Sequence, residues 1–334
     1  MNLERTKQIK AAITAVGGYV PNTILSNADL EKMVDTNDAW IRSRTGIKER
    51  RILKDASKAT SFLAIEAAKD LISKSNLDPE TIDLILVATV TPDMPVAATA
   101  AYVASSIGAK NAFAYDLSAA CSGFLYGMST SAAYISSGRY KKVLLIGADK
   151  MSSIVDYTDR TTCVIFGDGA GAVLFEASPN EFGWEDEYLR SDGQERMSLG
   201  IKAGGSLHPT THETVENNWQ YLYQEGKTVF KSAVSEMADS AAEILKRNTL
   251  TGKEIDFLIP HQANKRIIDA TAQRIGLRED QVLMNITYYG NTTAATIPLL
   301  LNDYQSKFKK GDKMIFAAFG GGFTWGSAYL TWAY

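Results

Sequence analysis

The sequence predicts an α/β protein that is built from two similar halves, each with a largely parallel sheet. The first observation is that apolar runs of strand length alternate with amphipathic segments of helix length. The second is that this order of elements occurs twice along the chain. The third is that no low-complexity tract rich in Pro, Gly or Ser separates the halves, so we expect them to pack tightly.

In the first half, apolar runs alternate with segments that have helical periodicity. The expected strands cover residues 82–90, 112–117, 143–147 and 172–176, and the expected helices cover 61–75 and 124–136. The second half follows the same alternation. Its expected helices cover residues 229–247, 265–275 and 294–304, and its expected strands cover 255–259, 282–286, 314–319 and 327–332.

Local sequence supports the duplication. Leu77 lies five residues before Ile82, and Leu250 lies five residues before Ile255 in a matching context. Each half also ends with a glycine cluster before an apolar strand, at 167–171 and at 320–322. We therefore divide the chain into residues 1–177 and 178–334. The polar stretch 178–225 has little periodicity, and we interpret it as a linker with surface loops.

Composition excludes several classes of protein. The chain has 334 residues, of which 45% are hydrophobic, so it is not intrinsically disordered. A net charge of −3 argues against a general polyphosphate or nucleic-acid binder. No apolar run approaches the ~18 to 20 residues of a membrane helix, and the first ten residues have no apolar signal core. Two cysteines exclude a disulfide framework and a four-cysteine zinc site, so we expect a reduced, cytoplasmic protein.

Cys121 is the first candidate for chemistry. It lies among small residues between an expected strand that ends near Leu117 and an expected helix. A thiol at a helix N-terminus experiences the positive end of the helix dipole, which favours the thiolate. A lone cysteine is more commonly a buried structural residue, but this position favours a nucleophile. Cys163 lies in an apolar run and is better interpreted as core.

His261 and Asn291 are the other two candidates, and both follow expected strands. The carboxyl ends of strands are where α/β proteins gather their ligands. For His261 a hydrogen-bonded core imidazole is about equally plausible, and for Asn291 the alternative is an ordinary turn with an N-cap. In the duplicated architecture, we expect Asn291 to occupy the place that Cys121 holds in the first half. A thiol, an imidazole and an amide suit acyl transfer to sulfur followed by carbanion chemistry.

Two further patterns carry less weight. His208 and His212 have the spacing of a metal pair on a helix, but Pro209 and the nearby threonines argue against a helix there, so we expect no metal site. The glycine cluster at 167–171 is followed by an apolar strand rather than a helix. A dinucleotide-binding turn needs a helix after its glycines, so this interpretation fails.

With these residues in view, the sequence resembles the β-ketoacyl-[acyl carrier protein] synthase III family of thiolase-like condensing enzymes. The similarity runs over nearly the whole chain and is weakest between residues 178 and 225. The motifs that carry it are Trp40-Ile41-Arg42-Ser43-Arg44-Thr45-Gly46-Ile47, Ala119-Ala120-Cys121-Ser122-Gly123, Arg160 with residues 166–172, His261-Gln262-Ala263-Asn264, Gly290-Asn291-Thr292 and residues 320–326. The resemblance implies a five-layer αβαβα sandwich of two duplicated halves.

The resemblance also implies catalytic roles. Cys121 would be the acylated nucleophile, and His261 and Asn291 would stabilise the enolate formed when a malonyl unit loses carbon dioxide. The backbone N–H groups of Cys121 and Gly321 would form the oxyanion hole. Acyl-CoA and malonyl-[acyl carrier protein] would be substrates, and no cofactor would be permanently bound.

Further positions are implied by the same resemblance to bind coenzyme A and the carrier protein. The coenzyme A and pantetheine positions are Trp40, Arg44, Arg160, Asn264 and Phe319. The basic positions for docking the acidic acyl carrier protein are Lys231, Arg266 and Arg274, although each alone is typical of a solvated helix face. The family also implies a homodimer. Val96 matches a position where members commonly have a phenylalanine that closes the partner subunit's acyl pocket, so we expect branched or longer primers to be accepted.

Three functional hypotheses result. The leading one is a decarboxylating condensation of an acyl-CoA primer with malonyl-[acyl carrier protein] that initiates fatty-acid synthesis. A related condensing enzyme of a secondary-metabolite pathway would share the same three residues. A non-catalytic module that binds acyl-CoA or the carrier protein is the third, but such a module needs no thiol, imidazole and amide together.

Overall fold

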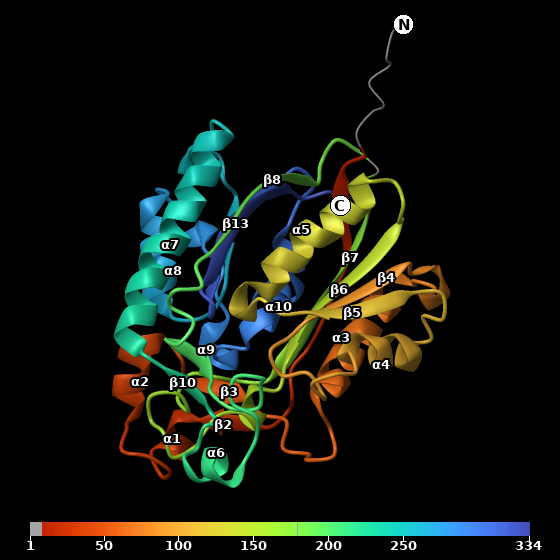
Figure 1. The fold of residues 1–334 in the computed structure, drawn as a ribbon. Coiled ribbons are helices and arrows are strands. Elements are labelled where there is room, and N and C mark those ends of the chain that lie inside the picture. Colours follow the sequence, from red (N-terminus) through yellow and green to blue (C-terminus); the bar gives the residue numbers. More distant parts are fainter. Residues whose placement is uncertain (1–8, 179) are drawn as a thin grey trace, which may run out of the picture.

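The computed structural model describes residues 9–178 and 180–334, and they form five layers in the order helix, sheet, helix, sheet, helix (Figure 1). The eight N-terminal residues, part of the segment inspected above for a signal, lie outside the described residues. The layered thiolase-like fold predicted from the sequence is confirmed.

The first sheet has the strand order β1-β7-β6-β4-β5. Its strands are β1 (Ala11–Tyr19), β4 (Leu84–Ala88), β5 (Phe113–Leu117), β6 (Lys142–Asp149) and β7 (Gly169–Ala177). β4 is parallel to β5 and β6, whereas β7 is antiparallel to β6 and β1. The register pairs Ala88 with both Leu117 and Gly147, so the parallel strands end at one level.

The second sheet has the order β11-β12-β13-β8. Its strands are β8 (Trp184–Ser191), β11 (Phe257–Pro260), β12 (Lys313–Gly320) and β13 (Thr324–Thr331). The pairing is parallel between β11 and β12 and antiparallel thereafter. This is the sequence of directions found along β4-β6-β7-β1, so the two sheets repeat one topology.

Helices cover both outer faces and fill the space between the sheets. α3 (Thr60–Ser75) and α4 (Thr99–Ile107) pack on the first sheet, and α7 (Gly226–Arg247) and α8 (Lys265–Arg274) pack on the second. α5 (Gly123–Ser136) and α10 (Thr296–Tyr304) form the middle layer. Because the middle helices touch sheets on both sides, they are apolar around most of their circumference, whereas α7 buries one stripe that includes Ala233, Met237 and Ala241.

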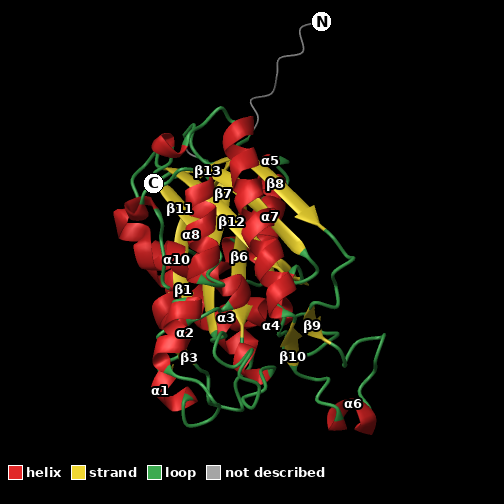
Figure 2. Ribbon diagram, turned by 90° about the vertical axis from the view of Figure 1, so that its left-hand side faces the viewer, coloured by secondary structure: helices red, strands yellow, loops and turns green. Residues whose placement is uncertain are grey.

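Smaller elements lie at the end of the sandwich where the site forms. They are β2 (Ile24–Ser26), α1 (Asn27–Leu30), α2 (Asp38–Thr45), β3 (Glu49–Arg51), β9 (Leu199–Ile201), α6 (His212–Glu216), β10 (Leu222–Gln224) and α9 (Ile286–Tyr289). β9 and β10 pair, and α6 lies on an arm that projects from the body in Figure 2. His212 begins α6, while His208 lies outside it against the ring of Trp219.

Two predictions about elements are wrong. The strand expected at 282–286 is reduced to a single parallel bridge between Val282 and Leu258, because Gln262 Oε1 accepts the backbone N–H groups of Asn285 and Ile286 that a ladder would need. The stretch 178–225 is more than a linker, because it supplies β8 to the second sheet. β8 has no buried residue, so its sequence lacks the apolar pattern of a core strand.

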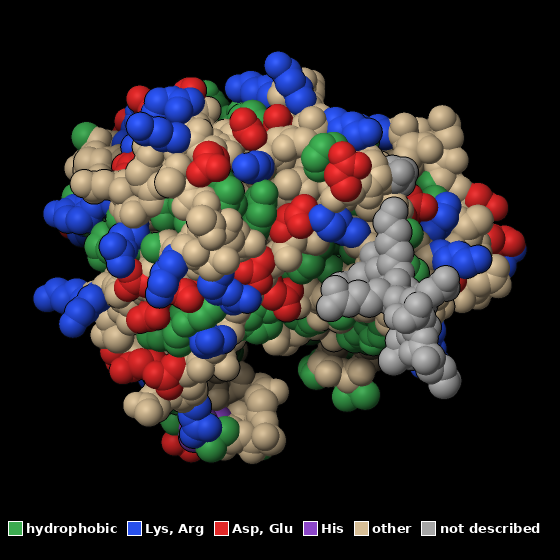
Figure 3. Space-filling view, turned by 90° about the horizontal axis from the view of Figure 1, so that it is seen from above, with side chains coloured by type: hydrophobic (Ala, Val, Ile, Leu, Met, Phe, Trp, Pro, Cys, Tyr) green, Lys and Arg blue, Asp and Glu red, His purple; other side chains and the backbone are tan. Residues whose placement is uncertain are grey.

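None of the helices in residues 9–178 and 180–334 is long and apolar enough to cross a bilayer. Figure 3 shows basic and acidic side chains interspersed over the visible part of one face, with no large field of a single sign.

Candidate active site

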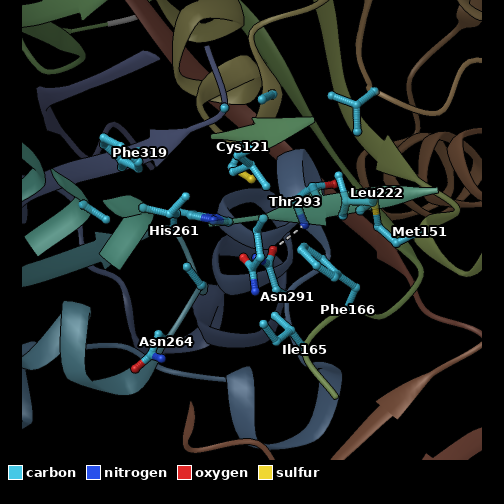
Figure 4. A pocket seen from close by; sticks show the side chains of 18 of the residues that line it. Cys121, Met151, Ile165, Phe166, Leu222, His261, Asn264, Asn291, Thr293 and Phe319 are labelled. Carbon is cyan, nitrogen blue, oxygen red and sulfur yellow. Dashed lines mark hydrogen bonds between the residues drawn. The ribbon is translucent and has the colours of Figure 1, made fainter. Parts of the chain in front are cut away.

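A cavity of about 350 Å³ lies where the two halves meet. Its lining includes Cys121 from the first half and His261, Asn291, Phe319 and Gly321 from the second. Figure 4 shows the side chains of Cys121, His261 and Asn291 pointing into a common space. The structure thus brings together the three residues that the sequence analysis selected on separate grounds.

Cys121 lies in a tight turn between β5 and α5. A short 3₁₀ turn, Ala120–Ser122, precedes the helix, and Ala120 has a φ of 48°. That left-handed conformation is unfavourable for an alanine and costs of the order of 1 to 3 kcal/mol. The turn is held by the start of β13, where Thr324 Oγ1 donates to Ala119 O at 2.9 Å and Thr324 O accepts from Ser122 Oγ at 2.9 Å.

Gly320 allows β12 to approach this turn closely. A Cβ atom at Gly320 would lie 2.6 Å from the backbone nitrogen of Cys121, which is closer than real contacts allow. The following residue, Gly321, lines the cavity. The glycine cluster therefore brings the backbone of the second half against the backbone of the nucleophile turn.

The thiol of Cys121 is protonated at neutral pH. Burial, and then the charge of Asp149, raise its pKa to about 12. The sequence analysis predicted the opposite direction from the helix dipole, and that prediction is wrong. Desolvation of a thiolate on a residue that is only 8% exposed outweighs the partial charge at the start of α5.

His261 follows β11 directly, and its backbone N–H donates to Ala317 O at 2.8 Å. The imidazole is 1% exposed, and burial lowers its pKa to about 3, so it is neutral at physiological pH. Its Nδ1 lies 2.7 Å from Thr296 Oγ1. Among the described residues its Nε2 has no hydrogen-bond partner, and Figure 4 shows this side of the ring directed into the cavity.

The side-chain amide of Asn291 is oriented by one local hydrogen bond. Asn291 Oδ1 accepts from the backbone N–H of Thr293 at 2.8 Å, the dashed line in Figure 4. Because the oxygen is used in this way, the NH₂ group of Asn291 is the part that can donate to a substrate. The backbone of Asn291 pairs with 165–167 of the first half, through its N–H to Ile165 O at 2.9 Å and its O from Gly167 N at 3.1 Å.

The internal symmetry places these residues differently from the prediction. Thr293 has a φ of 52°, begins the 3₁₀ turn Thr293–Ala295 and precedes α10, so it matches Ala120. Counting from these two residues, the equivalent of Cys121 is Ala294. The expectation that Asn291 occupies the place of Cys121 is therefore wrong, because it lies three residues earlier.

Asp149, at the end of β6, is a site residue that sequence reasoning missed. Its Oδ1 accepts from Thr89 Oγ1, from Val90 N at 2.8 Å and from both donors of Thr91, and its Oδ2 accepts from Ala294 N at 3.2 Å and from Thr293 Oγ1. Burial raises its pKa, and the hydrogen bonds oppose that rise by stabilising the carboxylate. Asp149 therefore fastens the turn of the second half to the end of the first sheet.

The apolar side of the cavity was also missed. This side is lined by Met151, Ile154 and Phe166. It is also lined by the β9–β10 pair, whose Leu199 and Leu222 come from the segment interpreted as surface loops. Strands of three residues give too short a pattern to detect from sequence. These side chains surround the space beside Cys121 with hydrocarbon.

The positions that the resemblance implied for coenzyme A lie partly on the surface and partly in the cavity wall. Trp40 and Arg160 stack on each other at the surface, with Arg160 Cζ 4.8 Å from the ring centroid. Asn264 lines the cavity and caps the N-terminus of α8, where its Oδ1 accepts from Arg266 N and its Nδ2 donates to the backbone O of Arg44. The side chain of Arg44 is exposed, and Phe319 is buried against Phe323 at the cavity wall.

The positions implied for docking and for primer choice lie on the surface. Lys231 and Arg266 are exposed on α7 and α8, and Arg266 Cζ lies 4.7 Å from the ring centroid of Phe230. Arg274 is exposed and donates to Asp239 Oδ1 at 2.8 and 3.0 Å. Val96 is 98% exposed and is not part of the lining of the cavity.

Known proteins resemble the chain over nearly its whole length. A protein of Chlorobium chlorochromatii named β-ketoacyl-[acyl-carrier-protein] synthase III is 56% identical over 97% of this chain and 100% of its own length. One of Bacteroides thetaiotaomicron named β-ketoacyl-[acyl-carrier-protein] synthase III 2 is 54% identical over 98% of both chains. The crystal structure of 3-oxoacyl-[acyl-carrier-protein] synthase III from Aquifex aeolicus superposes with a TM-score of 0.88 at 41% identity, covering 96% of this chain and 100% of that one.

A duplicated five-layer fold with a thiol, an imidazole and an amide at the junction of its halves defines a thiolase-like condensing enzyme. The family models of 3-oxoacyl-[acyl-carrier-protein] synthase III and of its C-terminal region match residues 115–193 and 245–332. The chain belongs to the β-ketoacyl-[acyl-carrier-protein] synthase III family. It is an acyltransferase that initiates fatty-acid synthesis by condensation, and the two alternative hypotheses are not favoured.

Proposed function

We propose that Cys121 accepts the acyl group of an acyl-CoA primer and that the reaction ends with attack on this acyl group by a malonyl-derived enolate. In the first half-reaction, Cys121 Sγ bonds to the acyl carbon and the bond from this carbon to the coenzyme A sulfur breaks. The Cys121 thiol loses one proton in this step, and the departing coenzyme A sulfur gains one, so the step is balanced. The thiol needs to lose its proton only as the acyl group arrives, which is consistent with its raised pKa.

In the second half-reaction, His261 Nε2 and the NH₂ group of Asn291 would donate to the thioester oxygen of malonyl-[acyl carrier protein]. Carbon dioxide leaves, and its bonding electrons form the enolate whose oxygen the two donors stabilise. The enolate carbon then bonds to the acyl carbon, and the bond from this carbon to Cys121 Sγ breaks. Its electrons leave with the sulfur, which takes up one proton from water to restore the thiol. Donors that are fixed before the charge develops need little reorganisation.

The oxyanion of each tetrahedral intermediate would be held by the backbone N–H groups of Cys121 and Gly321. The close approach at Gly320 supports this assignment, because it brings the two backbone segments together beside the thiol. Burial of Phe319 in the cavity wall supports a further role in keeping water from the enolate.

Coenzyme A would bind at the Trp40–Arg160 pair. The guanidinium of Arg160 lies 4.8 Å from the ring centroid of Trp40, so the two groups are in direct contact. To bind between them, an adenine ring would have to move them apart. Arg44 would contact the nucleotide, and Asn264 would orient the pantetheine arm, since it lines the cavity beside the exposed end of α2. The Trp40→Ala variant should raise KM for acetyl-CoA and leave KM for the malonyl-carrier protein unchanged.

The acidic acyl carrier protein would dock on Lys231, Arg266 and Arg274. Exposed basic side chains on two packed helices support this, although Arg274 already pairs with Asp239. Long-range attraction between charged surfaces weakens as salt shortens the Debye length from ~10 Å at 0.1 M. Arg266→Ala should reduce turnover of malonyl-[acyl carrier protein] and preserve acylation by acetyl-CoA, with the exposed Lys110→Ala in the other half as control.

A homodimer would form along β5, the outer strand of the first sheet. This edge carries exposed aromatic side chains, with Phe113 41% exposed among Tyr115, Tyr134 and Tyr140. An open apolar edge strand is a site for pairing with a second chain. Sedimentation of the protein should give twice the 36.4 kDa mass, and Phe113→Lys should reduce it toward the mass of one chain.

In such a dimer, Val96 would reach the partner's acyl cavity and set primer size. Its exposure supports a role outside its own cavity. Val96→Phe should lower kcat/KM for isobutyryl- and hexanoyl-CoA relative to acetyl-CoA, whereas Val215→Phe on α6 should not. An unchanged ratio in Val96→Phe would show that Val96 does not line the cavity.

We place the enzyme in the cytoplasm, because its nucleophile must remain a free thiol and both cysteines are unpaired. The convergence of Cys121, His261 and Asn291 on one cavity is the observation that carries the proposed roles. Mass spectrometry after incubation with a panel of acyl-CoAs should find the acyl mass on Cys121 and on no other residue. Acylation elsewhere, or none, would overturn the assignment.

A further inference from the structure

Thr296, the first residue of α10, contacts the face of His261 that is turned away from the cavity. Its Oγ1 lies 2.7 Å from His261 Nδ1 and 3.0 Å from the backbone oxygen of Thr293. Thr296 is 2% exposed, so no bulk solvent competes for these contacts. A hydroxyl group has one proton, so it can donate to only one of these two partners at a time.

The direction of this hydrogen bond decides what His261 presents to the substrate. If the hydroxyl donates to Thr293 O, Nδ1 must carry the imidazole proton, and Nε2 faces the cavity as a lone pair. If the hydroxyl donates to Nδ1, the proton of the neutral ring lies on Nε2, which then faces the cavity as a donor.

We infer that the Thr296 hydroxyl donates to His261 Nδ1 and thereby fixes His261 as an Nε2–H donor, which makes Thr296 a positioning residue for decarboxylation. This inference rests on the role proposed above for His261. The first support is that the backbone oxygen of Thr293 already accepts the backbone N–H of Thr296, so it needs no second donor. The second is that the distance of 2.7 Å between Oγ1 and Nδ1 is typical of a hydroxyl donor, since an N–H that donates to an oxygen usually lies ~2.9 to 3.0 Å from it.

The surroundings of Nε2 give a third support. Nε2 makes no hydrogen bond to Cys121 or to any other described residue, so no thiol proton is directed at a lone pair on this nitrogen. The amide of Asn291 presents its NH₂ group to the same cavity, because its oxygen is bonded to Thr293 N. Two donors can share one enolate oxygen, whereas a lone pair beside a donor cannot.

The local sequence explains why a threonine fits this position. The 3₁₀ turn at Thr293–Ala295 delays the start of α10, so that residue 296 begins the helix with its side chain against the end of β11. The equivalent residue in the first half is Gly123, which has no side chain. The hydroxyl is therefore present only in the half that carries His261.

The protonation site of His261 can be measured directly. The chain has three histidines, so protein labelled with ¹⁵N-histidine gives few signals, and His208→Asn and His212→Asn variants assign them. We expect the wild-type spectrum to show the proton of the neutral His261 ring on Nε2 and an acceptor-type Nδ1. A proton on Nδ1 in wild type would overturn the inference, whatever the variants do.

Variants test the consequence for catalysis. Thr296→Val removes the hydroxyl at nearly constant shape and should slow decarboxylation of malonyl-[acyl carrier protein] about tenfold, while self-acylation by acetyl-CoA changes less than about twofold. Thr296→Ser should retain decarboxylation, and Thr271→Val, which removes a buried hydroxyl of α8 that donates to Ile267 O, should leave both half-reactions unchanged. In Thr296→Val the Nδ1 resonance should shift toward that of an unbonded nitrogen.

Other outcomes separate this inference from the proposed roles. If Thr296→Val slows acylation as much as decarboxylation, the hydroxyl does not act through a donor role of His261, and the inference is wrong. If His261→Ala retains decarboxylation, the role proposed for His261 fails, whereas the spectrum still reports which nitrogen is protonated. If Thr296→Val does not fold, the spectra of wild type and Thr296→Ser decide the question.

Discussion

The turn at residues 118–123 and the turn at residues 291–296 have the same backbone design but different chemistry. Each has a non-glycine residue with positive φ, Ala120 or Thr293, followed by a 3₁₀ turn and a central helix. The first turn has mostly small, apolar residues and presents one thiol to the cavity, whereas the second has three threonines and one side-chain amide. The symmetry of the fold brings the two turns together, and their side chains make the site asymmetric.

The difference in polarity has an electrostatic consequence. Burial raises the pKa of the thiol in the first turn to about 12, and the charge of Asp149, which fastens the polar turn, contributes to that rise. The polar turn provides donors that are held in place by a network reaching into the first half. The predictions below disturb one turn at a time and compare the effect on the two half-reactions.

The largest effect should follow from removal of the nucleophile. Cys121→Ser should reduce self-acylation by about 10³-fold or more, because a hydroxyl with no adjacent base is a poor nucleophile. Decarboxylation should be retained in part, since the donors of the second turn are untouched. Acyl transfer can be followed by mass spectrometry and decarboxylation by release of ¹⁴CO₂, and parallel losses in both would contradict separate roles for the turns.

Asp149→Asn should weaken the second turn and alter the first. The new side-chain NH₂ group would face N–H and O–H donors that now bond to the Asp149 carboxylate. Because these donors would lose their acceptor, the free energy of unfolding should fall by about 2 to 3 kcal/mol. Because the charge of Asp149 raises the pKa of Cys121, its removal should lower that pKa and speed alkylation by iodoacetamide at pH 8. Denaturant melts and alkylation rates test the two parts, and slower alkylation of folded Asp149→Asn would contradict the account.

Gly320→Ala should disturb the contact between the two halves at the first turn. The added Cβ would lie 2.6 Å from Cys121 N, so we expect a loss of about 1 to 3 kcal/mol in stability and a marked loss of acylation. Gly193→Ala, where the added Cβ would meet nothing within 4 Å, is the matched control. Equal melting temperatures for the two variants would show that the close approach is not needed.

The smallest effect concerns the pH dependence of stability. Burial lowers the pKa of His261 to about 3 from 6.5, so the unfolded state binds a proton below pH 6.5 that the folded state does not. Stability should therefore fall as pH decreases from 6.5 toward 3, by about 1.4 kcal/mol from this residue at pH 5.5. The difference in unfolding free energy between wild type and His261→Ala should shrink on acidification, and a constant difference would contradict the assignment.

Much of the fold could be predicted because its central elements have strong local patterns. The helix expected at 61–75 is α3 at residues 60–75, and the one expected at 265–275 is α8 at residues 265–274. Their amphipathic periodicity is independent of distant contacts. β8 was missed because an edge strand without buried residues has no such pattern.

The site was predictable where chemistry depends on residue type and position in the chain. Cys121 and His261 follow β5 and β11, and the repeated topology brings these strand ends together, whereas Asn291 follows α9 in place of the expected strand. Asp149 gives no local signal, because its partners come from residues 89–91 and 293–294. The direction of the pKa shift of Cys121 was predicted wrongly. A helix dipole can be inferred from sequence, whereas desolvation depends on packing from both halves.

The division of labour between the two turns is tested most directly by measuring both half-reactions in Asn291→Ala. The account predicts that malonyl decarboxylation falls by about 10²-fold or more, because one of two donors to the enolate oxygen is lost. Self-acylation of Cys121 by acetyl-CoA should fall much less, since the first turn remains intact. Equal losses in the two half-reactions, with the variant folded, would contradict the account.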